Sequence, residues 1–238
     1  MVADAGIIGV AITNLGYVGN GFTEPNQPSG EYPLHSNVEH LFMGGIWVGA
    51  QTLNGTVHIS VGAQDVSNLQ AGDEVREFVN STEFVKEWSN LQNSDNYHPD
   101  ALATEHIECV FNDVDVVEII NHQPLGLKVI LRALSWNSPY ADDFVILDYR
   151  IINISGSELQ NVYVGYWNDT TIGNTQITNP YPGAQGTPWN YYDDVNGGWR
   201  PGDVEGDESI WMMYERDDDG EDNMATSWIG TRLLGALP

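Results

Sequence analysis

The stretch with the most evident chemical potential is an acidic turn, ERDDDGED, at residues 215–222. It places Asp217, Asp219 and Asp222 around Gly220. Calcium binds about six to eight hard oxygen ligands, and closely spaced carboxylates on a turn supply them. The spacing departs from that of an EF-hand loop. The turn therefore indicates either a calcium site or an acidic run that simply faces water.

A second polar segment, NDTTIGN at 168–174, also follows a predicted strand. We expect this segment and the acidic turn to meet at one end of the fold, where Asp169 would complete a site begun on the turn. A net negative charge favours such a site, because a bound cation relieves the repulsion between neighbouring carboxylates. Calcium is thus the predicted cofactor. The predicted metal ligands are Asp169, Asp217, Asp219 and Asp222.

Aromatic residues gather in and beside a long Gly-, Pro- and Asp-rich segment at 168–207. Three of them, Trp189, Tyr191 and Trp199, are candidate ligand-binding residues. Exposed Trp and Tyr rings can stack on sugar faces, which predicts a carbohydrate-binding module. The same rings can instead pin a long loop onto a sheet, which is a purely structural role.

Compact catalytic motifs are missing from the sequence. It has no HExxH, no GxSxG, no phosphate-binding glycine loop and no CxxC pair. With 34 acidic residues, chance carboxylate pairs are certain, so their presence says nothing about a glycosidase. We therefore predict no catalytic residues and no enzyme, with a glycoside-active enzyme as the third reading.

The charge balance excludes several partners. The chain has 34 acidic and 8 basic residues, a net charge of -26, which repels nucleic acid and anionic lipid. The sequence has no uninterrupted apolar run of about 18 residues, so it does not predict a membrane-spanning segment. The single cysteine, Cys109, forms no intrachain disulfide, and the apolar alternation around Ile107 and Val110 predicts a buried core thiol.

Apolar residues at period two, punctuated by Gly, Pro, Asn and Asp, predict an all-β chain. We expect one domain over 1–238, an antiparallel β-sandwich that is jelly-roll-like or Ig-like, with long irregular loops and a loop insertion at 168–207. Only 74–91 has any helical character. The predicted strands are 5–14, 39–51, 55–63, 106–121, 126–137, 143–154, 159–167, 208–215 and 226–234.

The short polar connection between 143–154 and 159–167 predicts a hairpin of two antiparallel neighbours. In the first of these strands, Val145, Leu147, Tyr149 and Ile151 alternate with polar residues and should face the core.

Residues 122–174 contain "PLG-L-V", "YADDF", a "Y-I-N" strand and "L-VY-G", followed by an acidic turn. With EHLFMGGIWVGAQ at 39–51 and MATSWIGTRLLGAL at 224–237, this pattern resembles a largely uncharacterised β-sandwich domain. That domain recurs towards the N-terminal side of large bacterial secreted and surface proteins, which often carry a C-terminal sorting module. The resemblance implies export, a sandwich fold and acidic loops, and it carries over no catalytic residue. The loop positions it implies are Asn168, Asp169, Asp193, Asp194, Asp217, Asp218, Asp219 and Asp222.

Two functions from different classes follow. The first is a non-catalytic, extracellular structural or adhesive surface domain, calcium-stabilised and self-assembling through strand edges. Its partners would be further copies of itself or other surface proteins. The second is a carbohydrate-binding module with a glycan as partner. The N-terminus has no basic region and is not a signal peptide, so a secreted location requires an export signal that this chain does not show.

Overall fold

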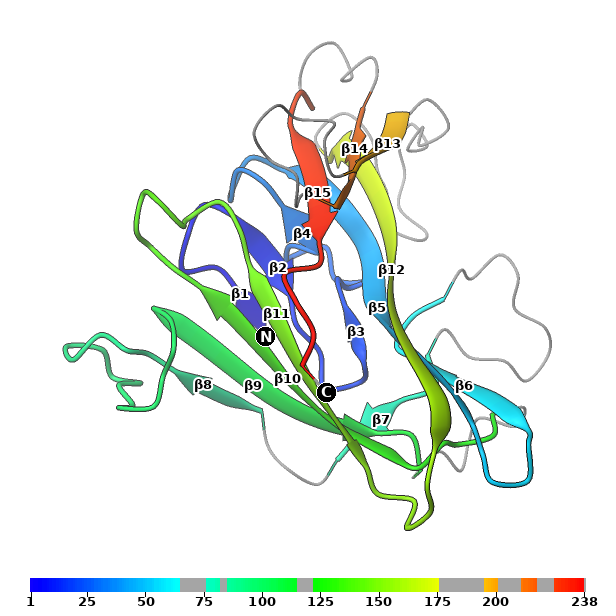
Figure 1. The fold of residues 1–238 in the computed structure, drawn as a ribbon. Coiled ribbons are helices and arrows are strands. Elements are labelled where there is room, and N and C mark those ends of the chain that lie inside the picture. Colours follow the sequence, from blue (N-terminus) through cyan, green and yellow to red (C-terminus); the bar gives the residue numbers. More distant parts are fainter. Residues whose placement is uncertain are drawn as a thin grey trace.

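The protein is all-β in the part of the chain that its computed structural model describes, which is 1–64, 76–81, 85–114, 122–175, 195–200, 211–217 and 225–237. These residues contain no helix, and their strands form two large antiparallel sheets and one small one (Figure 1). None of the sheets closes into a barrel. The predicted sandwich-like all-β fold is confirmed. Among the same residues, none forms a helix long and apolar enough to cross a membrane.

The first sheet is built around β5, a strand of 14 residues. It pairs with β12 along one side and with several short strands along the other. The strands of this sheet are β1 (Val2–Ala3), β2 (Gly9–Ala11), β3 (Tyr17–Val18), β4 (Gly30–Glu31), β5 (Val38–Gln51), β6 (Val57–Val61) and β12 (Gln160–Asn174).

The second sheet has the order β11-β10-β9, with β7 and β8 both pairing with the far side of β9. Its strands are β7 (Val79–Asn80), β8 (Lys86–Trp88), β9 (Glu105–Asn112), β10 (Leu127–Ser135) and β11 (Ile146–Asn153). The third, small sheet consists of β13 (Val195–Trp199), β14 (Met212–Arg216) and β15 (Trp228–Arg232).

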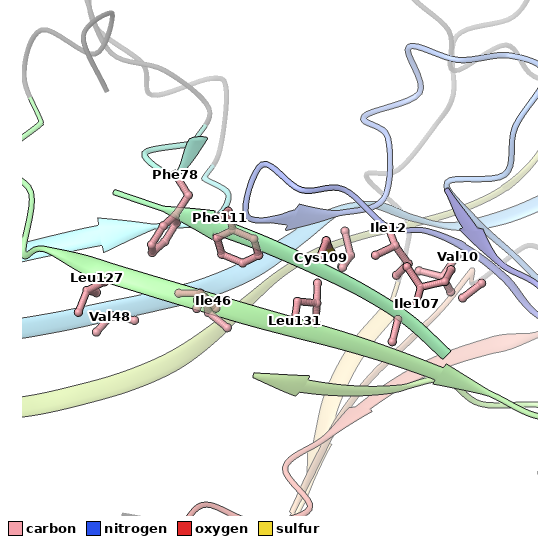
Figure 2. Close-up of a cluster of buried hydrophobic side chains, with 14 of the residues drawn as sticks. Val10, Ile12, Ile46, Val48, Phe78, Ile107, Cys109, Phe111, Leu127 and Leu131 are labelled. Atoms are coloured by element: carbon pink, nitrogen blue, oxygen red, sulfur yellow. The ribbon is translucent and has the colours of Figure 1, made fainter. Parts of the chain in front are cut away.

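The core lies between the two large sheets, as Figure 2 shows. Period-two alternation sends Ile107, Cys109 and Phe111 of β9 inward, where they meet Ile46 and Val48 of β5. All five side chains are almost completely buried. Each large apolar side chain buried in this way contributes on the order of 1.5–3 kcal/mol, so this interface is the main source of stability. The predicted core position of Cys109 is confirmed.

The predicted hairpin of 143–154 and 159–167 is wrong. Both segments form strands, but β11 pairs with β10 in the second sheet and β12 pairs with β5 in the first. The connection between them therefore crosses from one sheet to the other at an end of the sandwich (Figure 1). A short polar turn fits either arrangement, so its length alone does not decide which strands pair. The predicted facing of β11 is confirmed, because Val145, Leu147, Tyr149 and Ile151 pack against the core.

Three other segments differ from their predicted form. Strand β12 continues to Asn174, so 168–174 is strand and not the start of the long loop. Of 5–14, only Gly9–Ala11 forms a strand. The described residues of 74–91, where we expected some helical character, contain the short strands β7 and β8 and no helix.

Glycine at position 45 lets β5 lie close to the backbone of residues 62–63 of the same chain. A Cβ atom there would lie 2.8 Å from the backbone nitrogen of Ala63 and from the backbone carbonyl carbon of Gly62. Backbone atoms cannot move aside as a flexible side-chain end can. On the paired strand β12, in contrast, a Cβ at Gly165 would meet nothing within 4 Å.

We therefore expect Gly45→Ala to destabilise the protein by about 1–3 kcal/mol, the usual cost of overpacking. Gly165→Ala, two positions from Trp167, the residue that faces Gly45 on β12, is the matched control and should change stability by less than about 0.5 kcal/mol. Urea unfolding of the two variants measures both values. Equal stabilities would contradict the close approach at Gly45.

Candidate calcium site and exposed strand edges

Two of the predicted metal ligands lie in regions that contact one another. Asp169 lies in β12 opposite Met43 of β5, and Asp217 directly follows β14 with 8% of its surface exposed. Strand β12 contacts β14, and the Asn168 side-chain amide donates to Thr231 Oγ1 of β15 at 3.2 Å. The two segments thus meet at the end of the sandwich that carries the third sheet (Figure 1).

The remaining predicted site residues lie wholly or partly outside the described residues. This applies to the metal ligands Asp219 and Asp222 and to the aromatic residues Trp189 and Tyr191. The backbone of Trp199 belongs to β13 and pairs with Met212, but its side chain is outside the described part. Within the described part, no three His, Cys, Asp or Glu side chains come together as a metal-binding group.

Asp113, just after β9, has the most deeply buried carboxylate in the part of the chain that the structure describes. It accepts hydrogen bonds from Ser60 Oγ at 2.7 Å, from the Leu125 amide at 2.8 Å and from the Leu127 amide at 2.6 Å. Ser60 belongs to the first sheet and Leu127 to the second. Three donors compensate the loss of hydration, so Asp113 connects the two sheets.

His122 extends this connection. Its Nδ1 lies 3.3 Å from Glu77 Oε1, and Glu77 Oε2 accepts from the Val61 amide at 3.1 Å. Burial alone would lower the pKa of His122, but the hydrogen bond and charge of Glu77 and the charge of Asp113 together raise it. The imidazole therefore joins the same network that holds β6 to the second sheet.

A second buried carboxylate, Glu39 of β5, lies opposite Glu31 of β4. It accepts hydrogen bonds from the backbone amides of Ser29 and Gly30, the shortest at 2.7 Å. Burial raises the pKa of Glu39 to about 7, and the neighbouring Glu31 adds to the rise, while the backbone donors oppose it. This carboxyl fixes the backbone of the 29–31 segment against β5.

Among the described residues, a histidine and a serine side chain lie within hydrogen-bonding distance at His40 and Ser227. The His40 Nε2 and Ser227 Oγ lie 2.8 Å apart. His40 is 2% exposed, and burial lowers its pKa to about 4, so the ring stays neutral but is closed to a substrate. Cys109 is equally closed, because burial raises the pKa of its thiol to about 12. Both residues serve packing in this arrangement.

The sandwich has two unpaired strand edges on one side. Among the described strands, β11 pairs only with β10, and β12 pairs only with β5. At the start of β12, the side chains of Val162, Tyr163 and Val164 are 51–77% exposed. On β6, which pairs with the other side of β5, Ile59 lies opposite Gly49 and is 50% exposed. These are open backbone edges with apolar side chains beside them.

A row of alternating charges crosses the second sheet on its outer surface. Lys86, Glu108, Arg132 and Asp148 are direct register partners on β8, β9, β10 and β11. Lys86 Nζ lies 3.2 Å from Glu108 Oε1, Arg132 Nε 3.2 Å from Glu108 Oε2, and Arg132 Nη1 3.7 Å from Asp148 Oδ2. We call these four residues the charge row. Its negative end is on the edge strand β11. Its positive end is on β8, whose outer side is lined by residues 96–98 through the Ser89–Tyr97 bridge.

Sequence reasoning missed the charge row. Alternation along β11 does place Asp148 on the outer surface, but the row appears only once the register of four strands is known. Comparison with protein-family models, with curated proteins and with solved structures gives no match.

The raised pKa of Glu39 predicts a pH dependence of stability. Between the ordinary value of 4.5 and about 7, the folded protein keeps a proton that the unfolded chain has lost. The free energy of unfolding should therefore fall as the pH rises through this window. The Glu39→Gln side chain is neutral at every pH, so this variant should lack the loss. Its free energy of unfolding, relative to that of the wild type, should therefore increase by on the order of 2 kcal/mol between about pH 5 and pH 8.

Urea unfolding of both proteins across this pH range measures the effect. Because every other titrating group is shared, the difference between the two profiles isolates Glu39. Parallel profiles would show that Glu39 is already ionised at low pH.

Proposed function

We propose that this chain is a non-catalytic structural or adhesive domain of a secreted surface protein, calcium-stabilised and associating through its strand edges. The observation that carries the proposal is a pair of strand edges, one from each large sheet, that have no partner strand among the described residues: β11 and the first part of β12, 160–167. Strands of this length with open edges are templates for pairing with another chain.

The exposed apolar residues support association over a solitary role. Soluble monomers protect long edge strands with charge, proline or short length. The first residues of β12 instead expose two valines and a tyrosine. Side chains of this kind stabilise an interface when a second strand covers them.

The interior supports a scaffold over an enzyme. Glu39, Asp113, His122 and His40 are buried, and the contacts described above link strands and turns. Buried titratable groups of this kind maintain a packed structure when their partners are backbone amides and neighbouring strands.

Calcium is proposed at the end of the sandwich where β12 contacts the third sheet. Asp169 and Asp217 would be its ligands in the described part, with Asp219 and Asp222 on the turn that follows. The net charge of -26 favours cation binding generally, and the acidic stretch 215–222 begins within the last residues of β14.

The test compares the wild-type domain in calcium with the same protein in EDTA. Sedimentation velocity should show a mass that grows with protein concentration, because association follows mass action. In calcium the melting temperature should be higher by several degrees, since a ligand that binds only the folded state stabilises it. The Asp169→Asn variant should lose most of this calcium effect.

Two outcomes would contradict the proposal. A monomer at every concentration, in calcium and in EDTA, would contradict association through strand edges. Identical melting temperatures in the two conditions would contradict stabilisation by calcium.

A further inference from the structure

We infer that β11 forms a symmetric interface with β11 of a second copy, in which the two strands pair antiparallel around a two-fold axis at Tyr149. The inference rests on the proposed association through strand edges, and it names the partner, a second copy of this chain. It also names the register, in which Asp148 of each copy lies opposite Arg150 of the other.

The backbone of β11 is open on the side that faces away from β10. The Ile154 amide donates to Gly126 O at 2.7 Å, on the β10 side, so residues at even positions of β11 direct their amides toward β10. Leu147, Tyr149 and Ile151 direct theirs outward, where no described group accepts them. In the proposed register Leu147 lies opposite Ile151, and the two Tyr149 residues lie opposite each other. Each pair can therefore exchange two backbone hydrogen bonds.

The C-terminal residues 233–237 pass in front of β11 in Figure 1 but do not pair with it. All of them are exposed, Leu234 by 68% and Leu237 by 97%. The described residues contain no backbone hydrogen bond between this segment and β11. A partner strand at this edge would therefore meet an exposed segment and not a packed one.

The outer face of β11 is self-complementary in charge. Asp148 and Arg150 lie two positions apart on this face, and both are exposed. In an antiparallel pair centred on Tyr149, the aspartate of each copy lies opposite the arginine of the other, which gives two favourable cross-strand pairs. A pair centred on Asp148 or on Arg150 would instead set two like charges directly opposite each other, which is destabilising. Of these three registers, charge favours the one centred on Tyr149.

The charge row continues across this junction. Within one copy, Asp148 has Arg132 on its β10 side, with Oδ2 and Nη1 3.7 Å apart. Arg150 lies beside Ile130 of β10 and has no ion pair among the described residues. In the proposed register Arg150 of the second copy lies on the open side of Asp148, so each aspartate has an arginine on both sides. These pairs oppose the general repulsion between two chains of net charge -26.

The apolar side chains of β11 match in the same register. On the outer face, Ile146 of each copy lies opposite Ile152 of the other. On the inner face, Leu147 lies opposite Ile151, and the two Tyr149 side chains flank the axis. The three inner-face residues pack against the core but are only partly buried. A second copy would cover the apolar surface that they leave exposed, which favours association.

A contact of this kind joins two chains and no more. Both copies contribute the same edge, so the interface is isologous and closes on itself. Association through β11 should therefore end at a dimer. Any larger assembly needs a second surface, and the unpaired first part of β12 is such a surface.

Charge reversal tests the register. Asp148→Arg sets an arginine opposite Arg150 of the second copy, and Arg150→Asp sets an aspartate opposite Asp148. In sedimentation equilibrium, each variant alone should dimerise at least about tenfold more weakly than the wild type. An equal mixture of the two should form a heterodimer, because both of its cross-strand pairs then join opposite charges. The double variant Asp148→Arg/Arg150→Asp exchanges the two charges and should recover most of the association.

Two controls separate the pairing from net charge. Asp95→Arg makes the same charge change as Asp148→Arg, on an exposed turn after β8, and Arg150→Lys keeps the positive charge at the interface. Both should dimerise like the wild type. At about 0.15 M salt the reach of the overall charge is about 8 Å, so contact pairs dominate. Circular dichroism and melting temperature verify folding, because Asp148 also contacts Arg132 of its own copy.

A cysteine pair gives a second readout that does not depend on charge. In the proposed register, position 148 of one copy and position 150 of the other form a non-hydrogen-bonded pair. Their Cα atoms would be about 4.5 Å apart, which a disulfide can bridge. Oxidation of mixed Asp148→Cys and Arg150→Cys proteins should give a covalent dimer with one copy of each. The native Cys109 is buried and stays out of the reaction.

The Asp148→Cys protein alone is the matched control for the disulfide. Its two cysteines would be diagonal neighbours about 7–8 Å apart, which is too far for a disulfide, so it should stay uncrosslinked.

Each outcome decides one claim. Weakening by both single variants with recovery in their mixture supports the proposed pairing, and weakening without recovery in the mixture overturns it. Wild-type association that neither charge reversal weakens also overturns the β11 pairing but leaves the proposed function standing. A disulfide between two Asp148→Cys copies overturns the axis at Tyr149. A wild type that is monomeric at every concentration overturns both proposals.

Discussion

The carboxylate of Asp113 is the interaction on which the arrangement of the two sheets depends. It follows β9 directly, accepts from the chain entering β10 and receives the hydroxyl of Ser60 from the opposite sheet. A fully buried carboxylate is costly unless its oxygens are satisfied, and these three donors satisfy them. The nonspecific apolar core holds the sheets together, whereas Asp113 and the adjacent Glu77–His122 pair determine where they meet.

Charged groups thus have two separate roles in this protein. Inside, Asp113 and Glu39 bind backbone amides and fix the ends of strands. Outside, the charge row links four strands in register. Such exposed pairs add little to stability, so their value is in specifying which strands can lie side by side.

The sequence predicts individual strands well where alternation is strong. Strands β5 and β10 occur where the pattern places them, because one face of each must be buried. Strand β9 confirms the first part of the predicted 106–121 but ends at Asn112. Strand partners are harder to predict. The 154–159 connection looks like a hairpin turn, yet it passes from one sheet to the other. Only the packing of the core determines whether two such strands pair with each other or join different sheets. Nothing near Asp113 in the sequence distinguishes it from the other acids, since its partner Ser60 is 53 residues away. The calcium and sugar predictions rest largely on residues outside the described part, so they stay predictions.

The most direct test of this account is the stability of Asp113→Ala beside that of Asp148→Ala, measured by urea unfolding. Removing Asp113 leaves two backbone amides and a buried hydroxyl without their acceptor, so the account predicts a loss of about 3 kcal/mol or more. Removing Asp148 breaks only an exposed ion pair and should cost less than about 1 kcal/mol. Similar small losses in both variants would contradict the view that Asp113 fixes the two sheets against each other.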